Sequence, residues 1–420
     1  MNSTTLNRIE PATTPKPHFL DGLAARAVHQ RLSGLAHGQV TLVDGNNHQR
    51  YGQRDALCPL SVTLQVHDPR FYSDIAFGGS IGAGEAYMQG YWSVNDLTAL
   101  VRILLQNREV LDGMETGFAR LTAPLQKALH WLNRNTRAGS QRNIAAHYDL
   151  GNEFFALFLD PTMMYSSAIF PHRDATLEEA SLAKLGRICR RLELNGGDHL
   201  LEIGTGWGGM AEYAARHTGC RVTTTTISRQ QYDYATQRIA AAGLSERVTV
   251  LLRDYRELEG QYDKLVSIEM IEAVGHRYLP QYFAACNRLL RPDGLMLLQS
   301  ILMPDQRYER SRHNVDFIQR YIFPGGFLPS TGAIATLTGT HTDMQLIDTL
   351  DITAHYADTL AAWRRRFHAG VDAIRALGYS EDFLRLWDYY FCYCEGGFRE
   401  RAIGTAQFLL AKPQYRPQPA

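Results

Sequence analysis

The sequence predicts an α/β protein with a doubly wound, mostly parallel sheet that has an antiparallel edge, preceded by a smaller α+β domain. From about residue 196, short apolar strands alternate with helices. Repeated βα units of this length imply a parallel sheet with right-handed crossovers. Before residue 108, the predicted strands and helices do not alternate in this regular way. A chain of 420 residues has room for two or three domains of ordinary size.

The second half of the chain supplies the elements of the large sheet. Strands are expected at 199–203, 221–225, 248–252, 264–268 and 294–298, from their apolar and β-branched runs. Helices are expected at 210–216, 229–242 and 278–290. Two late segments, 343–348 and 402–410, are expected to add edge strands.

The first part of the chain is predicted to consist of a flexible N-terminal segment and a small domain. Residues 1–18 contain three prolines and are expected to be flexible, and residues 19–108 are expected to form the α+β domain. Its predicted elements are a helix at 19–35, strands at 40–43 and 61–66, a glycine-rich turn at 78–87 that enters a helix, and an amphipathic segment at 96–106. This domain is a candidate for lipid docking.

Residues 109–145 are predicted to form an amphipathic linker. Apolar residues alternate there with the basic residues Arg120, Lys127, Arg134, Arg137 and Arg142. We favour a helix with one solvated face over a helix that lies on a membrane surface. The catalytic domain is then expected to occupy residues 146–420.

Composition narrows the classes of protein. Lys and Arg number 43, as do Asp and Glu, so an overall electrostatic grip on nucleic acid is not expected. The six cysteines are scattered, which predicts no disulfide framework and no metal site and suits a reducing cytoplasm. The polar N-terminus indicates no secretory signal, and no run of about 18 apolar residues predicts a membrane span.

A glycine turn follows the first predicted strand of the large sheet. Gly204, Gly206 and Gly209 fit the dinucleotide pattern GxGxxG, which by itself is weak evidence. A dinucleotide site also needs an acidic residue at the end of the second strand, where this chain has Thr224-Thr225-Thr226. The stretch from Glu202 to Gly208 also resembles the ExGxGxG pattern of S-adenosylmethionine-dependent methyltransferases.

We therefore favour a methyltransferase over a dehydrogenase, and a cofactor site over a turn without a ligand. So many glycines in one short turn are difficult to explain by packing alone, because glycine loses the most conformational entropy on folding. Asp254 and Tyr255 follow the third strand, where an acid could meet an adenine amine and an aromatic ring could stack on the base. The alternative for both residues is an ordinary solvated loop.

Several longer motifs resemble one family. They are His147–Phe155, Phe158–Ser166, Ser267–His276, Tyr321–Gly326, His355–Leu360 and Cys394–Arg399. In this order they closely resemble the catalytic domain of cyclopropane-fatty-acyl-phospholipid synthases and mycolic acid cyclopropane synthases, and Gly82–Trp92 resembles the family's N-terminal domain. The resemblance implies a Rossmann-like methyltransferase sheet that binds S-adenosylmethionine.

The resemblance also implies which residues bind the cofactor. Tyr165 and Ser166 would contact its methionine part, and the turn at Gly204 and Gly206 would line it. The ribose and adenine would be held by Thr226, Ser228 and Gln231, which would explain why no acid follows the second strand.

The family's reaction adds a methylene group across a cis double bond of a phospholipid acyl chain. The alkene attacks the sulfonium methyl, and a base then removes a proton from the resulting cation so that the ring closes. Water would destroy the cation, so the pocket must be apolar and closed. An acyl tunnel could be lined by Phe154, Phe155, Met163, Met164, Phe317, Tyr321 and Phe323, although each alone is more simply explained as core.

In the family the base is a bicarbonate ion, and the resemblance implies its site here. Glu272 and Tyr356 match family positions, and Ile301 matches one that contributes backbone. Ser167 and Gln299 stand where many members have Cys and His; both can hydrogen-bond an oxyanion, but neither can become cationic. Binding of bicarbonate is therefore open, and Glu272 could instead be a structural carboxylate that caps the next helix.

The sequence leaves other products and roles open. The same fold could give a methyl-branched or methylene acyl chain, or it could serve as a lipid-binding protein without catalysis. The expected partners are a phospholipid with unsaturated acyl chains, a transient membrane surface and a second copy in a homodimer, without nucleic acid. The expected location is the cytoplasm, with peripheral association at the inner face of the membrane.

Overall fold

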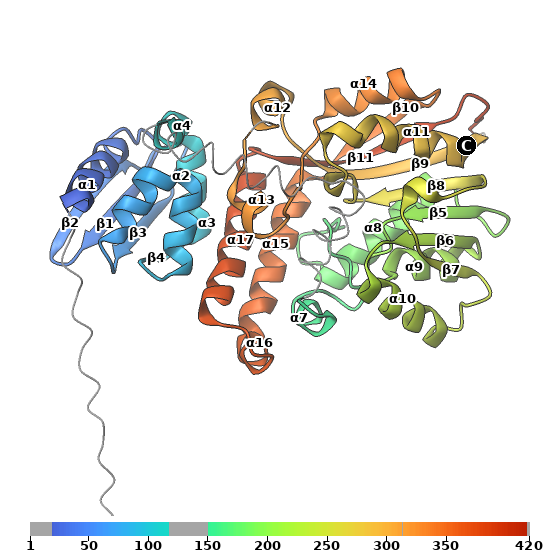
Figure 1. The fold of residues 1–420 in the computed structure, drawn as a ribbon, viewed down its shortest axis with the longest axis horizontal. Helices are drawn as coiled ribbons and strands as arrows, with labels where there is room; N and C mark the ends of the chain where they lie inside the picture. Colours follow the sequence, from blue (N-terminus) through green and yellow to red (C-terminus); the bar gives the residue numbers. More distant parts are fainter. Residues whose placement is uncertain (1–18, 117–149, 313, 418–420) are drawn as a thin grey trace, which may run out of the picture. The chain divides into compact units, whose positions relative to one another are not determined.

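The computed structural model describes residues 19–116, 150–312 and 314–417 (Figure 1). Within these residues the chain forms two compact units: 19–96 with 107–116, and 97–106 with the residues from 150 onward. The basic residues of the predicted linker lie outside the described residues. The predicted domain boundaries stay predictions.

The N-terminal unit is built on a four-stranded sheet in the order β2-β1-β3-β4. Its elements are α1 (Phe19–Leu32), β1 (Gly38–Asp44), β2 (Asn47–Gln53), β3 (Ser61–Val66), α2 (Arg70–Met88), β4 (Trp92–Val94) and α4 (Arg108–Thr116). Alternate side chains of β1 face the core, where Val40 and Leu42 are buried. This alternation is the period-two pattern expected of a half-buried strand.

The glycine-rich segment of this unit differs from its prediction. It was expected to be a turn that enters a helix, but it lies inside α2, which is interrupted at Gly79 (φ 59°, ψ −137°). A Cβ at Gly82 would lie 1.9 Å from the carbonyl oxygen of Asp74. The glycines therefore allow two helical turns to meet closely across a kink.

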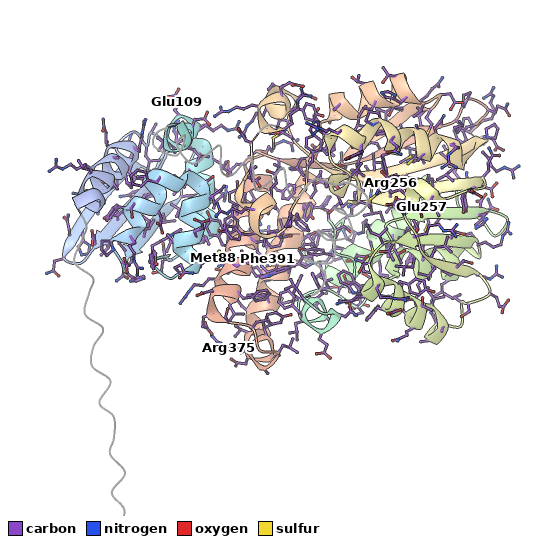
Figure 2. All side chains as sticks on the ribbon, viewed as in Figure 1. Met88, Glu109, Arg256, Glu257, Arg375 and Phe391 are labelled. Carbon is purple, nitrogen blue, oxygen red and sulfur yellow. The ribbon has the colours of Figure 1, made fainter. Side chains whose placement is uncertain are left out.

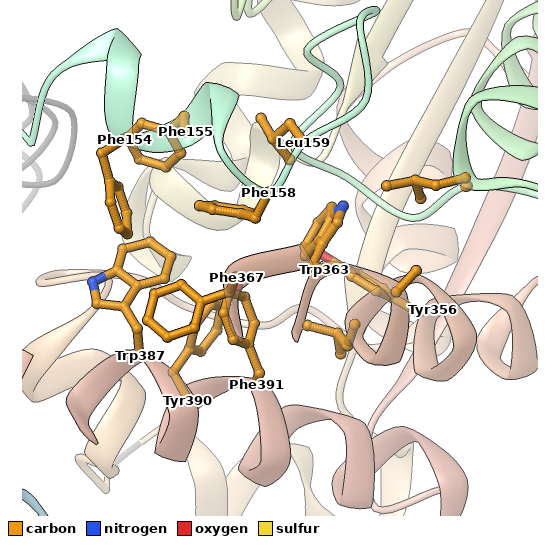
Figure 3. Close-up of a cluster of buried hydrophobic side chains, with 14 of the residues drawn as sticks. Phe154, Phe155, Phe158, Leu159, Tyr356, Trp363, Phe367, Trp387, Tyr390 and Phe391 are labelled. Atoms are coloured by element: carbon orange, nitrogen blue, oxygen red, sulfur yellow. The ribbon is translucent and has the colours of Figure 1, made fainter. Parts of the chain in front are cut away.

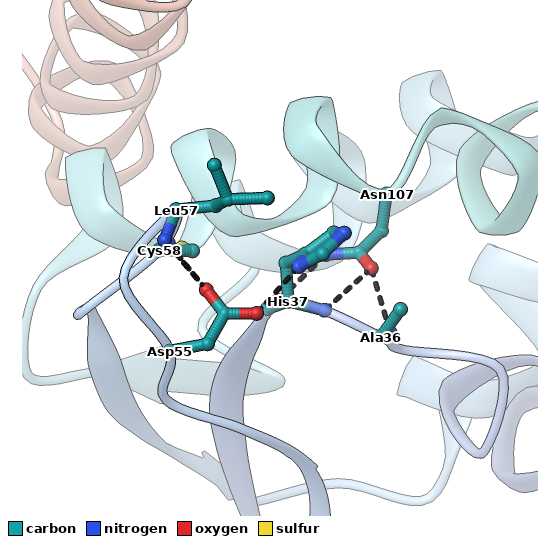
Figure 4. A network of polar contacts seen from close by, with 6 residues as sticks. All are labelled: Ala36, His37, Asp55, Leu57, Cys58 and Asn107. Carbon is teal, nitrogen blue, oxygen red and sulfur yellow. Dashed lines mark hydrogen bonds and ion pairs between the residues drawn. The ribbon is translucent and has the colours of Figure 1, made fainter.

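A polar network fastens the loops of the N-terminal unit (Figure 4). The Asn107 side-chain oxygen accepts hydrogen bonds from the amides of Ala36 (2.8 Å) and His37 (3.1 Å), and its amide donates to the His37 carbonyl (2.7 Å). His37 Nδ1 lies 2.6 Å from Asp55 Oδ2, and Asp55 Oδ1 accepts from the Cys58 amide at 2.7 Å. These contacts satisfy backbone groups that no strand pairs.

The second unit contains a seven-stranded sheet in the order β10-β11-β9-β8-β5-β6-β7. The strands are β5 (His199–Ile203), β6 (Arg221–Thr226), β7 (Val248–Leu252), β8 (Tyr262–Ile268), β9 (Leu290–Leu302), β10 (Gln345–Asp351) and β11 (Gly404–Ala411). The strands from β5 to β9 pair in parallel, whereas β11 is antiparallel to both of its neighbours. The predicted doubly wound, mostly parallel sheet is confirmed.

Helices cover both faces of this sheet (Figure 1). They are α8 (Leu177–Arg191), α9 (Gly209–Thr218), α10 (Arg229–Ala241), α11 (Leu279–Leu289) and α14 (Thr331–His341). Leu200 of β5 packs in one core with residues of α8 and α9, and Leu201 packs in the other with residues of α11 and α14. Because neighbouring strand residues point to opposite faces, the apolar run of β5 is buried on both sides.

A third core lies beyond the sheet and is aromatic (Figure 3). It is formed by α7 (Asn152–Ala156), α15 (Thr353–Ala369) and α17 (Glu381–Arg399), with further contributions from α13 (Phe317–Tyr321) and α16 (Val371–Ala376). The rings of Phe154 and Trp387 meet edge to face with centroids 4.7 Å apart. Helix α3 (Leu97–Gln106) joins this unit through Arg102, whose Nε lies 2.6 Å from Glu400.

The remaining described elements are short: η2 (Tyr255–Glu257), η3 (Ile271–Ala273), η4 (His276–Tyr278) and α12 (Asp305–Ser311). Side chains fill the space between the helices and the sheet (Figure 2). No helix among the described residues has the length and apolar character needed to cross a membrane.

Candidate active site

The candidate site lies where the strand order of the large sheet reverses. From β5 the chain passes to β6 and β7 on one side, and then returns to β8 and β9 on the other side. In doubly wound sheets, ligands bind at the carboxyl ends of the strands beside this switch point. The predicted glycine turn follows β5 at that edge.

The glycine turn has a backbone that only glycine adopts without strain. Gly204, Gly206 and Gly208 have φ values of 102°, 51° and 84°. A Cβ at Gly204 would lie 3.1 Å from Met270, whereas no described atom lies within 4 Å of a Cβ built at Gly206. The turn therefore leaves open space against its backbone, which suits a ligand that must approach the main chain closely.

Gly209 joins this turn to a neighbouring loop. A Cβ there would lie 2.3 Å from the carbonyl oxygen of Thr162, so the start of α9 rests directly on the backbone that leads to Tyr165. The two candidate cofactor segments are thus in contact through main-chain atoms.

The polar residues predicted on the ribose side come together at the end of β6. Thr226 Oγ1 donates to Gln231 Oε1 at 2.8 Å. The Ser228 side chain caps α10 by accepting from the Gln231 amide at 3.3 Å, an arrangement that its position at the helix start favours. All three residues are buried.

Asp254 and Tyr255 lie in the loop after β7, beside Arg256 and Glu257 (Figure 2). Both carboxylate oxygens of Asp254 accept from the Arg256 guanidinium, at 2.8 and 2.5 Å. The Tyr255 ring packs edge-on against Tyr282. The contact with adenine stays a prediction, since this carboxylate is held by an arginine.

A buried lysine supports the loop that carries Tyr165 and Ser166. Helix α8 begins with a capping box at Thr176 and places Lys184 in the interior. Lys184 Nζ donates to Ser166 Oγ at 2.7 Å, and the Tyr165 hydroxyl donates to that of Tyr390 at 3.0 Å. Sequence analysis did not single out this lysine.

The centre of the site is Glu269, immediately after β8. Its Oε1 accepts from the Ser167 amide at 2.9 Å and from Gln299 Nε2 at 2.8 Å, and its Oε2 accepts from the Tyr356 hydroxyl at 2.7 Å. Gln299 Nε2 also donates to the Ser167 carbonyl at 3.2 Å, and its oxygen accepts from Gln407 at 2.9 Å. Glu269 is therefore held from a loop, a strand and a helix.

Glu272 occupies the neighbouring position. Its Oε1 accepts from the Ile301 amide at 2.6 Å and from Ser300 Oγ at 3.0 Å. Its Oε2 is buried, and no described residue lies within hydrogen-bond distance of it. Glu272 does not cap the next helix, since no side chain caps η4 or α11.

Burial dominates the electrostatics of this site. It raises the pKa of Glu272 to about 8, helped by the nearby charge of Glu269. It also raises the pKa of Glu269, while the three donors and the charge of Lys184 oppose that rise. Burial raises the pKa of Glu202, which accepts from Thr224 Oγ1, to about 8, and lowers that of Lys184 to about 8.

The structure thus groups the five predicted catalytic residues around two carboxylates. Ser167, Gln299 and Tyr356 contact Glu269, and Ile301 contacts Glu272. Glu269 lies within the motif Ser267–His276 but was not among the residues predicted to act in the site. Its place one residue beyond a buried parallel strand, at the ligand-binding edge, was the signal that could have found it.

Apolar side chains surround this polar centre. The Tyr356 ring stacks on Phe398 with centroids 4.4 Å apart. It also meets the ring of Trp363 edge-on (Figure 3). Most of the residues predicted to line a tunnel are packed within or against the aromatic core: Phe154, Phe155, Met163, Tyr321 and Phe323. For Phe154 and Phe155, which are fully buried among other rings, a core role accounts for the contacts.

The sheet order, the glycine turn and the polar groups after β6 are the features of an S-adenosylmethionine-dependent methyltransferase. A family model described as mycolic acid cyclopropane synthetase matches residues 135–408, and the chain belongs to this family. It is therefore an S-adenosylmethionine-dependent methyltransferase of the cyclopropane synthase type.

Similar proteins support this assignment over most of the chain. The tuberculostearic acid methyltransferase UfaA1 of Mycobacterium tuberculosis is 41% identical over 373 residues, which is 84% of each chain. The cyclopropane-fatty-acyl-phospholipid synthase of Escherichia coli is 38% identical over 357 residues, 83% of this chain and 87% of the relative. The structure of the mycolic acid cyclopropane synthase CmaA1 complexed with SAH and CTAB superposes with a TM-score of 0.61 at 33% identity, covering 65% of this chain and 98% of that one.

Proposed function

We propose that this protein transfers a methylene group from S-adenosylmethionine to the cis double bond of a phospholipid acyl chain and forms a cyclopropane ring. The observation that carries the proposal is the pair of partly buried carboxyl groups, Glu269 and Glu272, after β8 near the glycine turn and next to an aromatic core. Such a site combines a proton acceptor with surroundings that exclude water.

The cofactor fits the residues at the switch point. When bound, S-adenosylmethionine supplies an electrophilic methyl group on a sulfonium. The turn at Gly204 and Gly206 would admit its amino-acid end against the backbone. Tyr165 and Ser166 would flank that end, with Ser166 oriented by the hydrogen bond from Lys184, and Thr226 with Gln231 would take the ribose side.

The aromatic surroundings suit a reaction that passes through a cation on the acyl chain. A carbocation is captured by water, so a productive site must keep water away from it. Tyr356 lies between the polar centre and the aromatic core, with its hydroxyl on Glu269 and its ring on Phe398. The Tyr356 hydroxyl is therefore already hydrogen-bonded where the polar centre meets the aromatic core.

The bicarbonate ion that the resemblance implies does not fit this site. Of the groups expected to hold it, the Ser167 amide, Gln299 and Tyr356 donate to the carboxylate of Glu269. The Ile301 amide donates to Glu272. An added anion would have to displace the Glu269 side chain or lie beside two partly buried carboxyl groups.

A lipid assay tests the proposal directly. The purified protein is incubated with vesicles of a cis-unsaturated phospholipid and S-adenosylmethionine labelled with ¹³C in the methyl group, and the fatty acids are then analysed by mass spectrometry and NMR. Ring methylene resonances support the proposal. Label in head groups alone, or in no lipid, contradicts it, and a methyl branch or an exocyclic methylene supports the alternative lipid methyltransferase.

Access to the lipid is part of the proposal. We expect peripheral contact with the inner face of the membrane, through the N-terminal domain or the basic residues of 109–145, and assembly as a homodimer. Sedimentation with anionic vesicles measures the contact, which should weaken at high salt and after replacement of Arg134 and Arg137 by Gln. Binding that is unchanged in both tests contradicts a role for the basic residues.

A further inference from the structure

We propose that Glu269 is the proton acceptor of the reaction, so that a side chain of the protein takes the role of the bicarbonate ion. This inference rests on the proposed function and names the base within the same site.

The first argument is the convergence of donors on Glu269. The Ser167 amide, the Gln299 amide group and the Tyr356 hydroxyl belong to segments far apart in the sequence, yet all lie within 2.7–2.9 Å of its two oxygens. A carboxylate is an acceptor only, and these donors together form an oxyanion site. Each of the three residues matches a position that the resemblance assigns to anion binding.

The second argument is that the backbone holds Glu269 in an uncommon conformation. Its φ of 49° lies in the left-handed region, which a residue with a side chain rarely adopts. The Glu269 amide donates to the Gln299 carbonyl at 2.8 Å, so Gln299 fixes both the main chain and the side chain. Such outliers persist where the surroundings over-determine them and are concentrated at functional sites.

The third argument is the division of charge between the two carboxyl groups. Two neighbouring carboxyl groups that are largely removed from solvent do not both ionise readily, and the charge of Glu269 raises the pKa of Glu272. Glu269 has three donors, whereas Glu272 has an oxygen without a partner among the described residues and a pKa raised to about 8. The three donors and the charge of Lys184 therefore favour the negative charge of the pair on Glu269 over Glu272.

The proton transfer can then be written with all bonds accounted for. The π electrons of the alkene form a bond to the methyl carbon while the carbon–sulfur bond breaks and its electron pair returns to sulfur. This leaves S-adenosylhomocysteine and a cation on the acyl chain. Glu269 takes one proton from the added methyl group, and the released C–H electron pair forms the third bond of the ring. The carboxylic acid loses this proton to water after the product leaves.

The test measures cyclopropane formation in buffer freed of carbon dioxide and again after bicarbonate is added. The wild type should be equally active in both. In Glu269→Gln, ring formation should fall by about 10²–10⁴-fold, the usual contribution of a general base, while binding of S-adenosylmethionine by calorimetry is retained. In Glu269→Gly, which accepts the positive φ and opens the donor site, added bicarbonate should raise the rate several-fold.

A matched control is Glu193→Gly. Glu193 also has a positive φ, 55°, but it is exposed after α8, so this variant should behave as the wild type with and without bicarbonate. Wild-type activity that requires bicarbonate, or a Glu269→Gln variant that keeps the wild-type rate, overturns the inference and leaves the proposed function standing. Wild-type protein that labels no acyl chain under any condition overturns the proposed function instead.

Discussion

Two carboxylates in this molecule have similar hydrogen bonding and opposite electrostatics. Asp55, in the N-terminal unit, accepts from His37 and from the amides of Leu57 and Cys58, and the hydrogen bond from His37 is the main cause that lowers its pKa (Figure 4). Glu269 also accepts three hydrogen bonds, yet its pKa is raised. The number of donors therefore does not distinguish a structural carboxylate from a reactive one.

The difference lies in solvation and in the charge of the partner. The Asp55 side chain is 30% exposed and faces a histidine that can become cationic. Glu269 is partly buried, its direct donors are neutral, and the charge of Glu269 raises the pKa of the neighbouring Glu272. Burial without a directly paired cation makes a carboxylate a better proton acceptor, because its protonated form is less disfavoured.

Apart from changes to Glu269 itself, replacing Tyr356 by Phe should give the largest effect, on catalysis. It removes the donor to Glu269 Oε2 and keeps the ring on Phe398. A hydrogen bond to a charged group contributes about 1.5–3 kcal/mol, so the rate of ring formation should fall about 10–100-fold. Tyr415→Phe is the matched control, since Tyr415 donates to Glu193 at the same 2.7 Å on the surface. Equal rates of ring formation in Tyr356→Phe and Tyr415→Phe would contradict a special role for the hydrogen bond between Tyr356 and Glu269.

Replacing Asn107 by Ala should affect stability and not chemistry. The variant loses three hydrogen bonds to the backbone of Ala36 and His37. We expect the free energy of unfolding of the N-terminal unit to fall by about 1–3 kcal/mol, measured by urea denaturation. Asn47→Ala, at an exposed position of β2, is the control. A variant that folds as stably as the wild type would show that the network does not fasten the loops.

Replacing Glu272 by Gln should change how stability depends on pH. The pKa of Glu272 is raised to about 8 from an ordinary 4.5, so the folded state keeps a proton that the unfolded chain loses. Its contribution is complete below about pH 4.5 and is lost as pH rises through 8. Thermal unfolding should therefore show a smaller loss of Tm between pH 6 and 8.5 in the variant. If Tm changes with pH in the same way in Glu272→Gln and in the wild type, the pKa of Glu272 is not raised.

Replacing Asp55 by Asn should give the smallest effect, with the opposite sign. The lowered pKa of Asp55 stabilises the fold above its unfolded pKa, and this contribution is lost as pH falls through the folded value. Because the pair with His37 is partly exposed, Tm at neutral pH should fall by about 1–2 °C, with a shallower loss below pH 4. A large change at neutral pH would mean that Asp55 resembles the buried carboxylates.

The large sheet was predictable from the sequence because its strands are continuous apolar runs. The segment His199–Ile203 is buried on both faces, and its pattern has no other simple explanation. By contrast, β2 was missed because its sequence, Asn47–Gln53, is polar and mostly exposed at a sheet edge. The kinked helix α2 was read as a turn because its glycines serve close packing, which propensity does not reveal.

Most residues of the candidate site could be predicted from the sequence, but Glu269, to which several of them donate hydrogen bonds, could not. The resemblance pointed to Gln299 and Tyr356, and the glycine turn was evident from its spacing. Gln299 and Tyr356 both donate hydrogen bonds to Glu269, from which Tyr356 is 87 positions away in the sequence and Gln299 is 30 positions away. These side chains meet only in the folded chain, so the sequence alone did not show the role of Glu269. Lys184 was hidden for a similar reason, because in sequence it is one more basic residue on an amphipathic helix.

The contact at Gly209 has a consequence for engineering this enzyme. No side chain fits between the start of α9 and the Thr162 carbonyl, so a library that randomises position 209 should return glycine almost alone. Gly206, three residues earlier, has no described atom within 4 Å of a built Cβ, but its φ of 51° is one that residues with a side chain rarely adopt. The two positions therefore resist substitution for different reasons, which are a main-chain contact at Gly209 and the backbone conformation at Gly206.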